Sequence, residues 1–300
     1  MALYTKKKTD KISLAIRIAI IICVILVVFI SAMLILLSQG VPEEAEEAMP
    51  TETTQPLPTE EPTIPEPTLP KLNLPKSPYS ERDFDYEGKY LTCVSGPCML
   101  GVDVSYWQFN INWPLVKAAG MDYAMIRLAW RGSQEGTMEE DSYARINYQG
   151  AKDAGLLVGG YFFSQAITVE EAIEEAEFVL EMTKDMEFDM PIAFDWEQTG
   201  GRTAGMDART LTDCAKAFCQ TLEEGGLDAM VYFNVYFAYN NMYLEELTDY
   251  GFWLAMYESR MDFPYKIDMW QHTDNGTVAG IDGPVDMNIY MIYDEETPAD

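Results

Sequence analysis

Four acidic residues interrupt apolar segments of this 300-residue chain. Asp103 lies in GVDVS, Asp195 and Glu197 lie in AFDWE, and Asp286 lies in PVDMN. Burying a carboxylate among apolar neighbours is costly unless the group is paired or functional. Apolar and acidic surroundings raise the pKa of a carboxyl group, which can then keep its proton and act as a general acid. The four residues are therefore candidate catalytic groups.

Asp195 and Glu197 are two residues apart on an expected strand. Because strand side chains alternate between two faces, both point the same way, with Cα atoms about 6–7 Å apart. Trp196 faces the other side. A salt-bridged or helix-capping pair is the structural alternative for this spacing, and a turn or cap residue is the alternative for Asp103 and for Asp286.

The sequence lacks the residue patterns of nucleophilic Ser or Cys sites, zinc sites and phosphate-binding loops. His272 is the only histidine, and no nucleophile elbow accompanies it. No cluster of His and Cys has zinc-ligand spacing, and no glycine-rich phosphate loop is present. Carboxylates are the catalytic groups that remain, and we expect no cofactor.

Eight apolar segments are expected as strands: residues 99–105, 123–129, 156–163, 190–197, 229–234, 252–257, 266–271 and 285–290. Their continuous apolar runs are typical of a parallel sheet buried on both faces. Expected helices are residues 142–154, 168–186 and 208–224, so the order predicts right-handed βα crossovers and an α/β fold, an irregular (β/α)8-type barrel. The later connections are short, which predicts that the second half lacks regular helices.

The acids fall near the C-terminal ends of these strands, the face that carries the active site in a β/α barrel. Closing the barrel makes the first and last strands neighbours, which brings Asp103 and Asp286 together. Aromatic rings can pack on the C–H faces of sugars, and amides can bind hydroxyl groups. The candidate substrate-binding residues are Tyr161, Trp270, Gln271, Tyr232, Gln108, Trp253 and Tyr257.

The N-terminus carries export signals. Residues 1–17 have a net charge of +4, from five basic residues and one Asp, and residues 18–37 contain no charge. Twenty apolar residues suit a bilayer core, and the preceding basic residues predict a cytoplasmic N-terminus. We therefore expect a single-pass protein of the cell membrane that contacts the lipid bilayer through residues 18–37. A signal peptide cleaved near Ser38 or Gly40 is the alternative, and it exports the rest of the chain equally.

Residues 38–80 are rich in Pro, Glu and Thr, cannot bury a core, and are expected to form a disordered linker. The expected order after it is a lead-in segment at 81–98, a catalytic barrel at 99–292 and an acidic tail at 293–300. The net charge of −29 excludes a nucleic-acid partner, because such a body repels phosphate. We expect the catalytic domain to be monomeric.

The cysteines support only limited conclusions. Cys93 and Cys98 bracket a turn-like segment and could close as a small disulfide. Cys214 and Cys219 are five residues apart on an expected helix, which places them on different faces, so we expect buried thiols.

Six motifs follow one another along the chain: GVDVSYWQ (101–108), YFF (161–163), AFDWE (193–197), FWLAMY (252–257), MWQHT (269–273) and VDMN (285–288). In this order they resemble glycoside hydrolase family 25, the lysozyme family of muramidases, over residues 99–292. The resemblance implies a modified β/α barrel with an acidic groove. It also implies hydrolysis of the β-1,4 bond between N-acetylmuramic acid and N-acetylglucosamine in peptidoglycan. The sequence departs from the pattern at Phe162, where many relatives have a histidine.

By the same resemblance, Glu197 is the acid/base and the three aspartates complete the site, with no metal. Two mechanisms stay open: a carboxylate nucleophile, or assistance by the substrate acetamido group that Asp195 orients. Three other functions are the alternatives. They are a barrel that binds peptidoglycan without cutting it, a hydrolase of another glycan, and a structural membrane protein.

Overall fold

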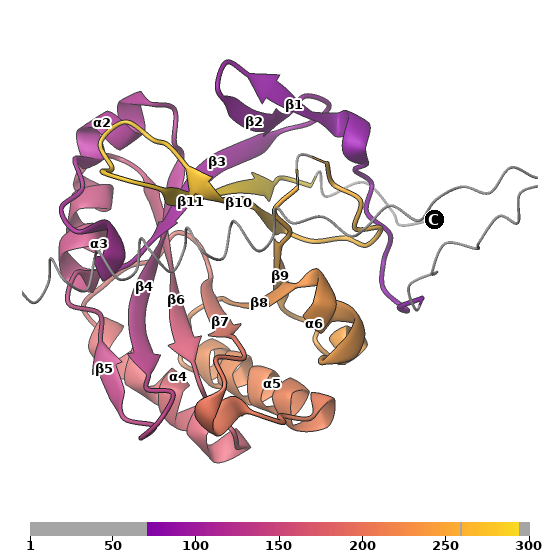
Figure 1. Ribbon diagram of the computed structural model, residues 1–300. Coiled ribbons are helices and arrows are strands. Elements are labelled where there is room, and N and C mark those ends of the chain that lie inside the picture. The colour runs from indigo at the N-terminus through magenta and orange to yellow at the C-terminus, as the bar shows by residue number, and fades with distance from the viewer. Residues whose placement is uncertain (1–70, 259, 294–300) are drawn as a thin grey trace, which may run out of the picture. The chain divides into compact units, whose positions relative to one another are not determined.

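The structure of the protein, a computed structural model, describes residues 71–258 and 260–293 (Figure 1). The expected basic tail, membrane span and acidic tail from 294 onward lie outside these residues, as does the linker up to residue 70. Within the described ranges, no helix is both long and apolar enough to cross a bilayer.

The strands are β1 (Phe84–Glu87), β2 (Tyr90–Cys93), β3 (Cys98–Val104), β4 (Tyr123–Arg131), β5 (Met138–Glu140), β6 (Leu157–Ser164), β7 (Ile192–Trp196), β8 (Ala229–Asn234), β9 (Gly251–Ala255), β10 (Met269–Gly276) and β11 (Val285–Met291). The α-helices are α2 (Trp113–Ala118), α3 (Ala144–Asp153), α4 (Val169–Thr183), α5 (Ala208–Glu224) and α6 (Val235–Asn240). The 3₁₀ turns are η1 (Glu81–Asp83), η2 (Tyr106–Gln108), η3 (Gly201–Thr203) and η4 (Leu244–Glu246).

Eight strands close into a barrel, which confirms the predicted fold and matches the eight expected segments. Strand β3 closes the ring by pairing with β4 on one side and β11 on the other, while β5 extends the edge of β4. From β3 through β10 the neighbouring strands of the ring are parallel, but β11 is antiparallel to both β10 and β3. The connection between β10 and β11, residues 277–284, is too short for a parallel crossover, which takes a dozen residues or more.

The three expected helices are present, and their ends follow capping rules. The Oγ1 atom of Thr168 accepts a 3.3 Å hydrogen bond from the Glu171 N–H at the start of α4, and Asp207 caps α5 in the same way. Helix α5 buries a stripe of Leu211, Ala215, Phe218 and Leu222, which are spaced one or two turns apart. The prediction that the second half lacks regular helices is confirmed only in part, because the short helix α6 connects β8 to β9, while from β9 onward the described residues contain no helix.

Side chains along β7 point alternately toward the helical layer and into the barrel interior. Phe194 and Trp196 pack outward, and the Phe194 ring lies 5.2 Å from the ring of Phe218 on α5. Ala193 points inward into a separate apolar cluster. Asp195 therefore also points inward, near the C-terminal end of β7. The alternation of side chains along the strand thus directs this acid toward the barrel axis.

The N-terminal approach to the barrel differs from the prediction. Residues 71–80, assigned to the linker, pack against the β9–β10 loop. Leu74 is buried, the Lys266 N–H donates to the Pro75 carbonyl at 2.8 Å, and the Ser77 N–H donates to the Pro264 carbonyl at 3.0 Å. Leu74 lets this segment bury apolar surface. The Pro, Glu and Thr content of the whole linker gave no indication of this. Strands β1 and β2 then form a separate two-stranded hairpin beside β3 and β10 (Figure 1).

The disulfide that Cys93 and Cys98 could form is not present in the structure, in which both are free thiols. Cys93 is buried in the main apolar cluster, and Cys98 packs against the same cluster while its Sγ accepts the Cys93 N–H at 3.3 Å. Cys214 and Cys219 are fully buried free thiols, as expected.

Candidate active site

All four predicted acids line one cavity of about 200 Å³ at one end of the barrel. Asp103 comes from β3, Asp195 from β7, Glu197 from the residue after β7, and Asp286 from β11. The barrel thus joins side chains that lie up to 183 positions apart in the sequence.

Asp286 reaches this end by a different route from the one expected. It is the second residue of β11, near the start of the strand rather than the end. Because β11 runs antiparallel to its neighbours, its start lies where the parallel strands finish, and Asp286 pairs in register with Asp103. The predicted proximity of Asp103 and Asp286 is confirmed. The prediction that Asp286 lies near the C-terminal end of its strand was wrong.

The carboxyl groups of Asp103 and Asp286 share a hydrogen bond. Burial, followed by the charge of Asp103, raises the pKa of Asp286 to about 9. Burial also raises the pKa of Asp103, but amide N–H groups of Asn288 and Gln271 each donate to its Oδ2 at 2.8 Å and favour its charged form. Asp286 is therefore the protonated donor of the pair at neutral pH, and Asp103 is the acceptor.

Asp195 and Glu197 form the second pair. Asp195 is 7% exposed, and burial, then the charge of Glu197, raises its pKa well above the ordinary Asp value. Glu197 is more open to solvent, yet the protein atoms around its carboxyl and the charge of Asp103 raise its pKa as well. The two raised pKa values favour the protonated form in this pair, and the Oδ1 of Asp195 has no hydrogen-bond partner among the described residues.

Gln271 organises the floor of this cavity. Its Oε1 accepts the hydroxyl groups of Tyr232 and Tyr257, each at 2.9 Å, while its Nε2 donates to Asp103. These contacts fix the amide orientation, because only the NH₂ side can donate to a carboxylate. Gln271 therefore couples the aromatic wall of the cavity to the acidic centre.

A second cavity of about 480 Å³ adjoins the acidic cavity and shares Glu197, Tyr232 and Tyr257 with it. Exposed aromatic rings border both: Trp107 is 63% exposed beside the first cavity, and Tyr236 is 63% exposed beside the second. Glu197 thus lies where the two cavities meet.

Most of the predicted substrate-binding residues line the acidic cavity: Tyr161, Gln271, Tyr232, Gln108, Trp253 and Tyr257. Trp270 does not, and its position corrects the prediction. It neighbours inward-facing Gln271 on β10, so its ring points outward, is fully buried, packs 5.1 Å from Phe84 and donates to the Met256 carbonyl. Phe162 likewise faces the helices, between the rings of Phe178 and Phe218.

Sequence reasoning missed Arg127, Phe163 and Ser105, which also line the cavity. Arg127 had a visible signal, a single charge inside the apolar segment YAMIRLA. Its Nε donates to Asp141 at 2.8 Å, and its charge lowers the pKa of Asp195 against the effect of burial. Among the described residues, no group of three or more His, Cys, Asp and Glu is arranged to hold a metal ion.

Residues 102–281 match the family model for glycosyl hydrolases family 25. The chain belongs to that family. The match includes Asp103, Asp195 and Glu197, whereas Asp286 and the hairpin β1–β2 lie outside it.

Relatives of this family 25 protein are found in several bacteria. The uncharacterized protein YegX of Escherichia coli K12 is 30% identical over 205 residues, 66% of this chain and 72% of YegX. The autolytic lysozyme of Clostridium acetobutylicum is 28% identical over 195 residues, 63% of this chain and 55% of the lysozyme.

The fold is similar to the solved autolysin LytC of Streptococcus pneumoniae in complex with a synthetic peptidoglycan ligand. The TM-score is 0.58 at 20% identity, covering 65% of this chain and 47% of LytC. The family 25 protein thus spans about half the length of LytC and of the autolytic lysozyme, and at this identity the likeness to LytC concerns the fold.

Proposed function

We propose that this protein is a lysozyme that hydrolyses the β-1,4 bond between N-acetylmuramic acid and N-acetylglucosamine in peptidoglycan. Membership of family 25 and similarity to an autolytic lysozyme support this substrate. The observation that carries the proposal is the pair of Asp195 and Glu197, which share one cavity and have raised pKa values.

Glu197 acts as the general acid. It lies between the two cavities, where the scissile bond of a bound glycan crosses it, and its raised pKa lets it deliver a proton to the leaving oxygen. After the leaving sugar departs, the resulting Glu197 carboxylate takes a proton from the attacking water.

Asp195 orients the acetamido group of the substrate. Its unpartnered, buried Oδ1 is an acceptor for an amide N–H. Such a donor favours the charged form of Asp195 and leaves the shared proton on Glu197. The acetamido carbonyl oxygen then attacks the anomeric carbon, in place of a carboxylate nucleophile. Asp103 and Asp286 set the charge of the site from the opposite wall.

The location is part of the proposal. Residues 18–37 anchor the chain in the cell membrane with the N-terminus in the cytoplasm, and the barrel acts outside it. In cells, the full-length protein is expected to resist alkaline extraction from membranes, and external protease is expected to digest the barrel. A soluble form that begins shortly after Ser38 or Gly40 would instead show a cleaved signal peptide.

The substrate is tested by incubating the full-length protein, in detergent, with purified peptidoglycan and identifying new reducing ends by mass spectrometry. N-acetylmuramic acid at the new ends is expected. N-acetylglucosamine at the new ends would give a different bond specificity, and wall binding without new ends would make the barrel a binding module.

A further inference from the structure

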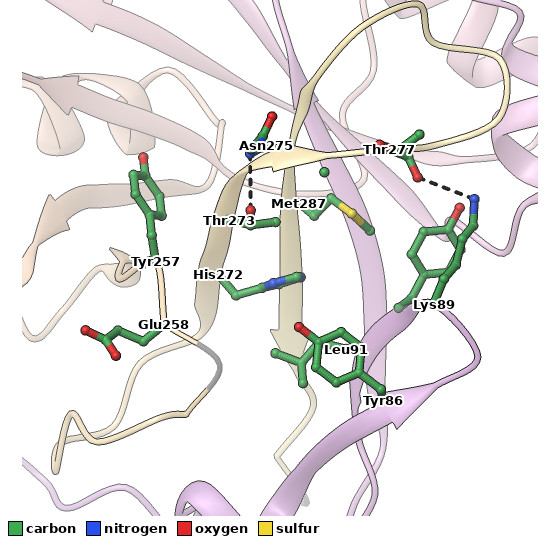
Figure 2. A pocket seen from close by; sticks show the side chains of 12 residues that line it. Tyr86, Lys89, Leu91, Tyr257, Glu258, His272, Thr273, Asn275, Thr277 and Met287 are labelled. Carbon is green, nitrogen blue, oxygen red and sulfur yellow. Dashed lines mark hydrogen bonds between the residues drawn. The ribbon is translucent and has the colours of Figure 1, made fainter.

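A cavity of about 430 Å³ lies between the hairpin β1–β2 and strand β10, outside the acidic centre (Figure 2). We call it the hairpin pocket and define it by Tyr86, Lys89, Tyr90, Glu258, His272 and Asn275. Tyr257 lines the hairpin pocket and the acidic cavity alike, so the two are neighbours. The hairpin residues Tyr86, Lys89 and Tyr90 precede the family match at 102–281, whereas Glu258, His272 and Asn275 lie within it, so one wall of the pocket comes from outside that match.

Two polar groups in the hairpin pocket lack partners. The hydroxyl of Tyr90 and the Nε2 of His272 are buried without a hydrogen bond to any described residue. His272 is only 8% exposed, and burial lowers its pKa to about 4, so its imidazole is neutral at physiological pH. Unsatisfied buried polar atoms are rare and costly in proteins, so a polar ligand that pairs with both atoms is favoured here.

The charges of the pocket are separated. The Lys89 ammonium lies 4.7 Å from the Tyr90 ring centre and donates at 3.4 Å to the Thr277 carbonyl, which leaves donors for a ligand. Glu258 is exposed at the opposite side, with His272 between the two (Figure 2). A lysine facing a cavity is notable in a chain of net charge −29, and it suits a carboxylate.

We propose that the hairpin pocket binds the stem peptide of peptidoglycan. This inference rests on the proposed lysozyme function. Stem peptides carry free carboxylates, backbone amides and an amino group, which match Lys89, the unpaired atoms of Tyr90 and His272, and Glu258 respectively. The peptide is attached to the muramic acid sugar, so a pocket adjoining the active site at Tyr257 lies on its path.

The test compares two substrates with the same glycan: peptidoglycan strands that carry peptides, and strands stripped of peptides by an amidase. The full-length protein is expected to prefer the first. Lys89→Met is expected to lower kcat/KM about tenfold on peptide-bearing strands, the scale of one lost charge-assisted hydrogen bond, and to leave stripped strands unaffected. Lys117→Met, at an exposed position of α2, is the matched control and is expected to change neither value.

Equal losses on both substrates would show that the pocket holds sugar, and no loss on either would show that Lys89 contacts no ligand. Both results overturn the inference. A second measurement separates it from the proposed lysozyme function. Synthetic L-Ala-γ-D-Glu-L-Lys-D-Ala-D-Ala is titrated onto Glu197→Gln protein, where no cleavage is needed. Saturable binding that Lys89→Met weakens supports the pocket, and absence of binding contradicts it.

Discussion

Asp286 lies directly opposite Asp103 across the antiparallel strands β11 and β3, and the two carboxyl groups share a hydrogen bond. With the pKa of Asp286 raised to about 9, this pair carries a proton throughout the neutral range. The register of β3 and β11, which close the barrel, holds the two carboxyl groups together. The charge of the site therefore depends on this strand pairing.

Asp286→Asn is expected to stabilise the protein at alkaline pH. The folded state binds more protons than the unfolded state between the ordinary Asp pKa of 3.8 and about 9, so stability falls as pH rises through that window. Asparagine cannot ionise and removes this loss. We expect Tm to rise by about 2–4 °C at pH 8, the effect of 1 kcal/mol in a domain of this size, and not at pH 4.

Calorimetry at both pH values checks this, with Asp282→Asn as a control at an exposed position in the connection that precedes β11. An Asp286→Asn protein less stable than the parent at pH 8 would contradict the proton assignment.

Asp103→Asn is expected to move the pH profile of activity. The charge of Asp103 contributes to the raised pKa of Glu197, so its removal lowers that pKa. A general acid must be protonated, hence the alkaline fall of kcat/KM begins at lower pH in the variant. Initial rates across pH measure this. An alkaline limb that stays in place would mean that another group than Glu197 controls it.

Asp195→Asn tests acetamido assistance. We expect kcat to fall by about 10²–10⁴-fold, the usual range for a positioned acid or base, because an amide replaces the carboxylate that accepts the acetamido N–H. A thiazoline analogue of the cyclised acetamido intermediate is expected to inhibit the parent and to bind the variant more weakly. Near-full activity in an Asp195→Ala variant, or a covalent glycosyl–Asp adduct seen by intact mass spectrometry, would contradict this role.

Arg131→Met tests a buried ion pair that supports the barrel. The Arg131 Nε lies 2.6 Å from Glu175, which is fully buried and whose pKa burial raises to about 7. Removing Arg131 leaves that charge uncompensated, so the free energy of unfolding should fall by about 3–5 kcal/mol at pH 8. At pH 5 Glu175 takes up a proton and the loss should be smaller.

Denaturant unfolding at the two pH values measures this difference. Arg145→Met removes exposed pairs and is expected to cost less than about 1 kcal/mol. Equal effects of the two variants would show that the Arg131–Glu175 pair is unimportant.

The sequence predicted the eight barrel strands and the helices α3 to α5, because continuous apolar runs and capped amphipathic stretches carry strong local signals. The family and a peptidoglycan hydrolase were predicted from the resemblance of the ordered motifs. It also predicted that Asp103 and Asp286 meet. The antiparallel direction of β11 was not predicted, since a buried run of residues does not encode the direction of its partner.

Side-chain detail was the other limit. Trp270 and Gln271 are adjacent on β10, and only their register in the barrel decides which one faces the acids. Cys93 and Cys98 are close enough in sequence to bond, but in the structure both are free thiols and the Cys98 Sγ accepts the backbone N–H of Cys93. The packing of Leu74 on the barrel depends on contacts with the distant β9–β10 loop.

The central claim is that Glu197 is the general acid of a lysozyme. It is tested most directly by comparing the rates at which the full-length protein and its Glu197→Gln variant form new reducing ends on peptidoglycan. Glu177→Gln, at an exposed position of α4, is the matched control. We predict a loss of about 10²–10⁴-fold for Glu197→Gln and none for Glu177→Gln. A Glu197→Gln protein that cleaves at a rate close to that of the parent would contradict the account.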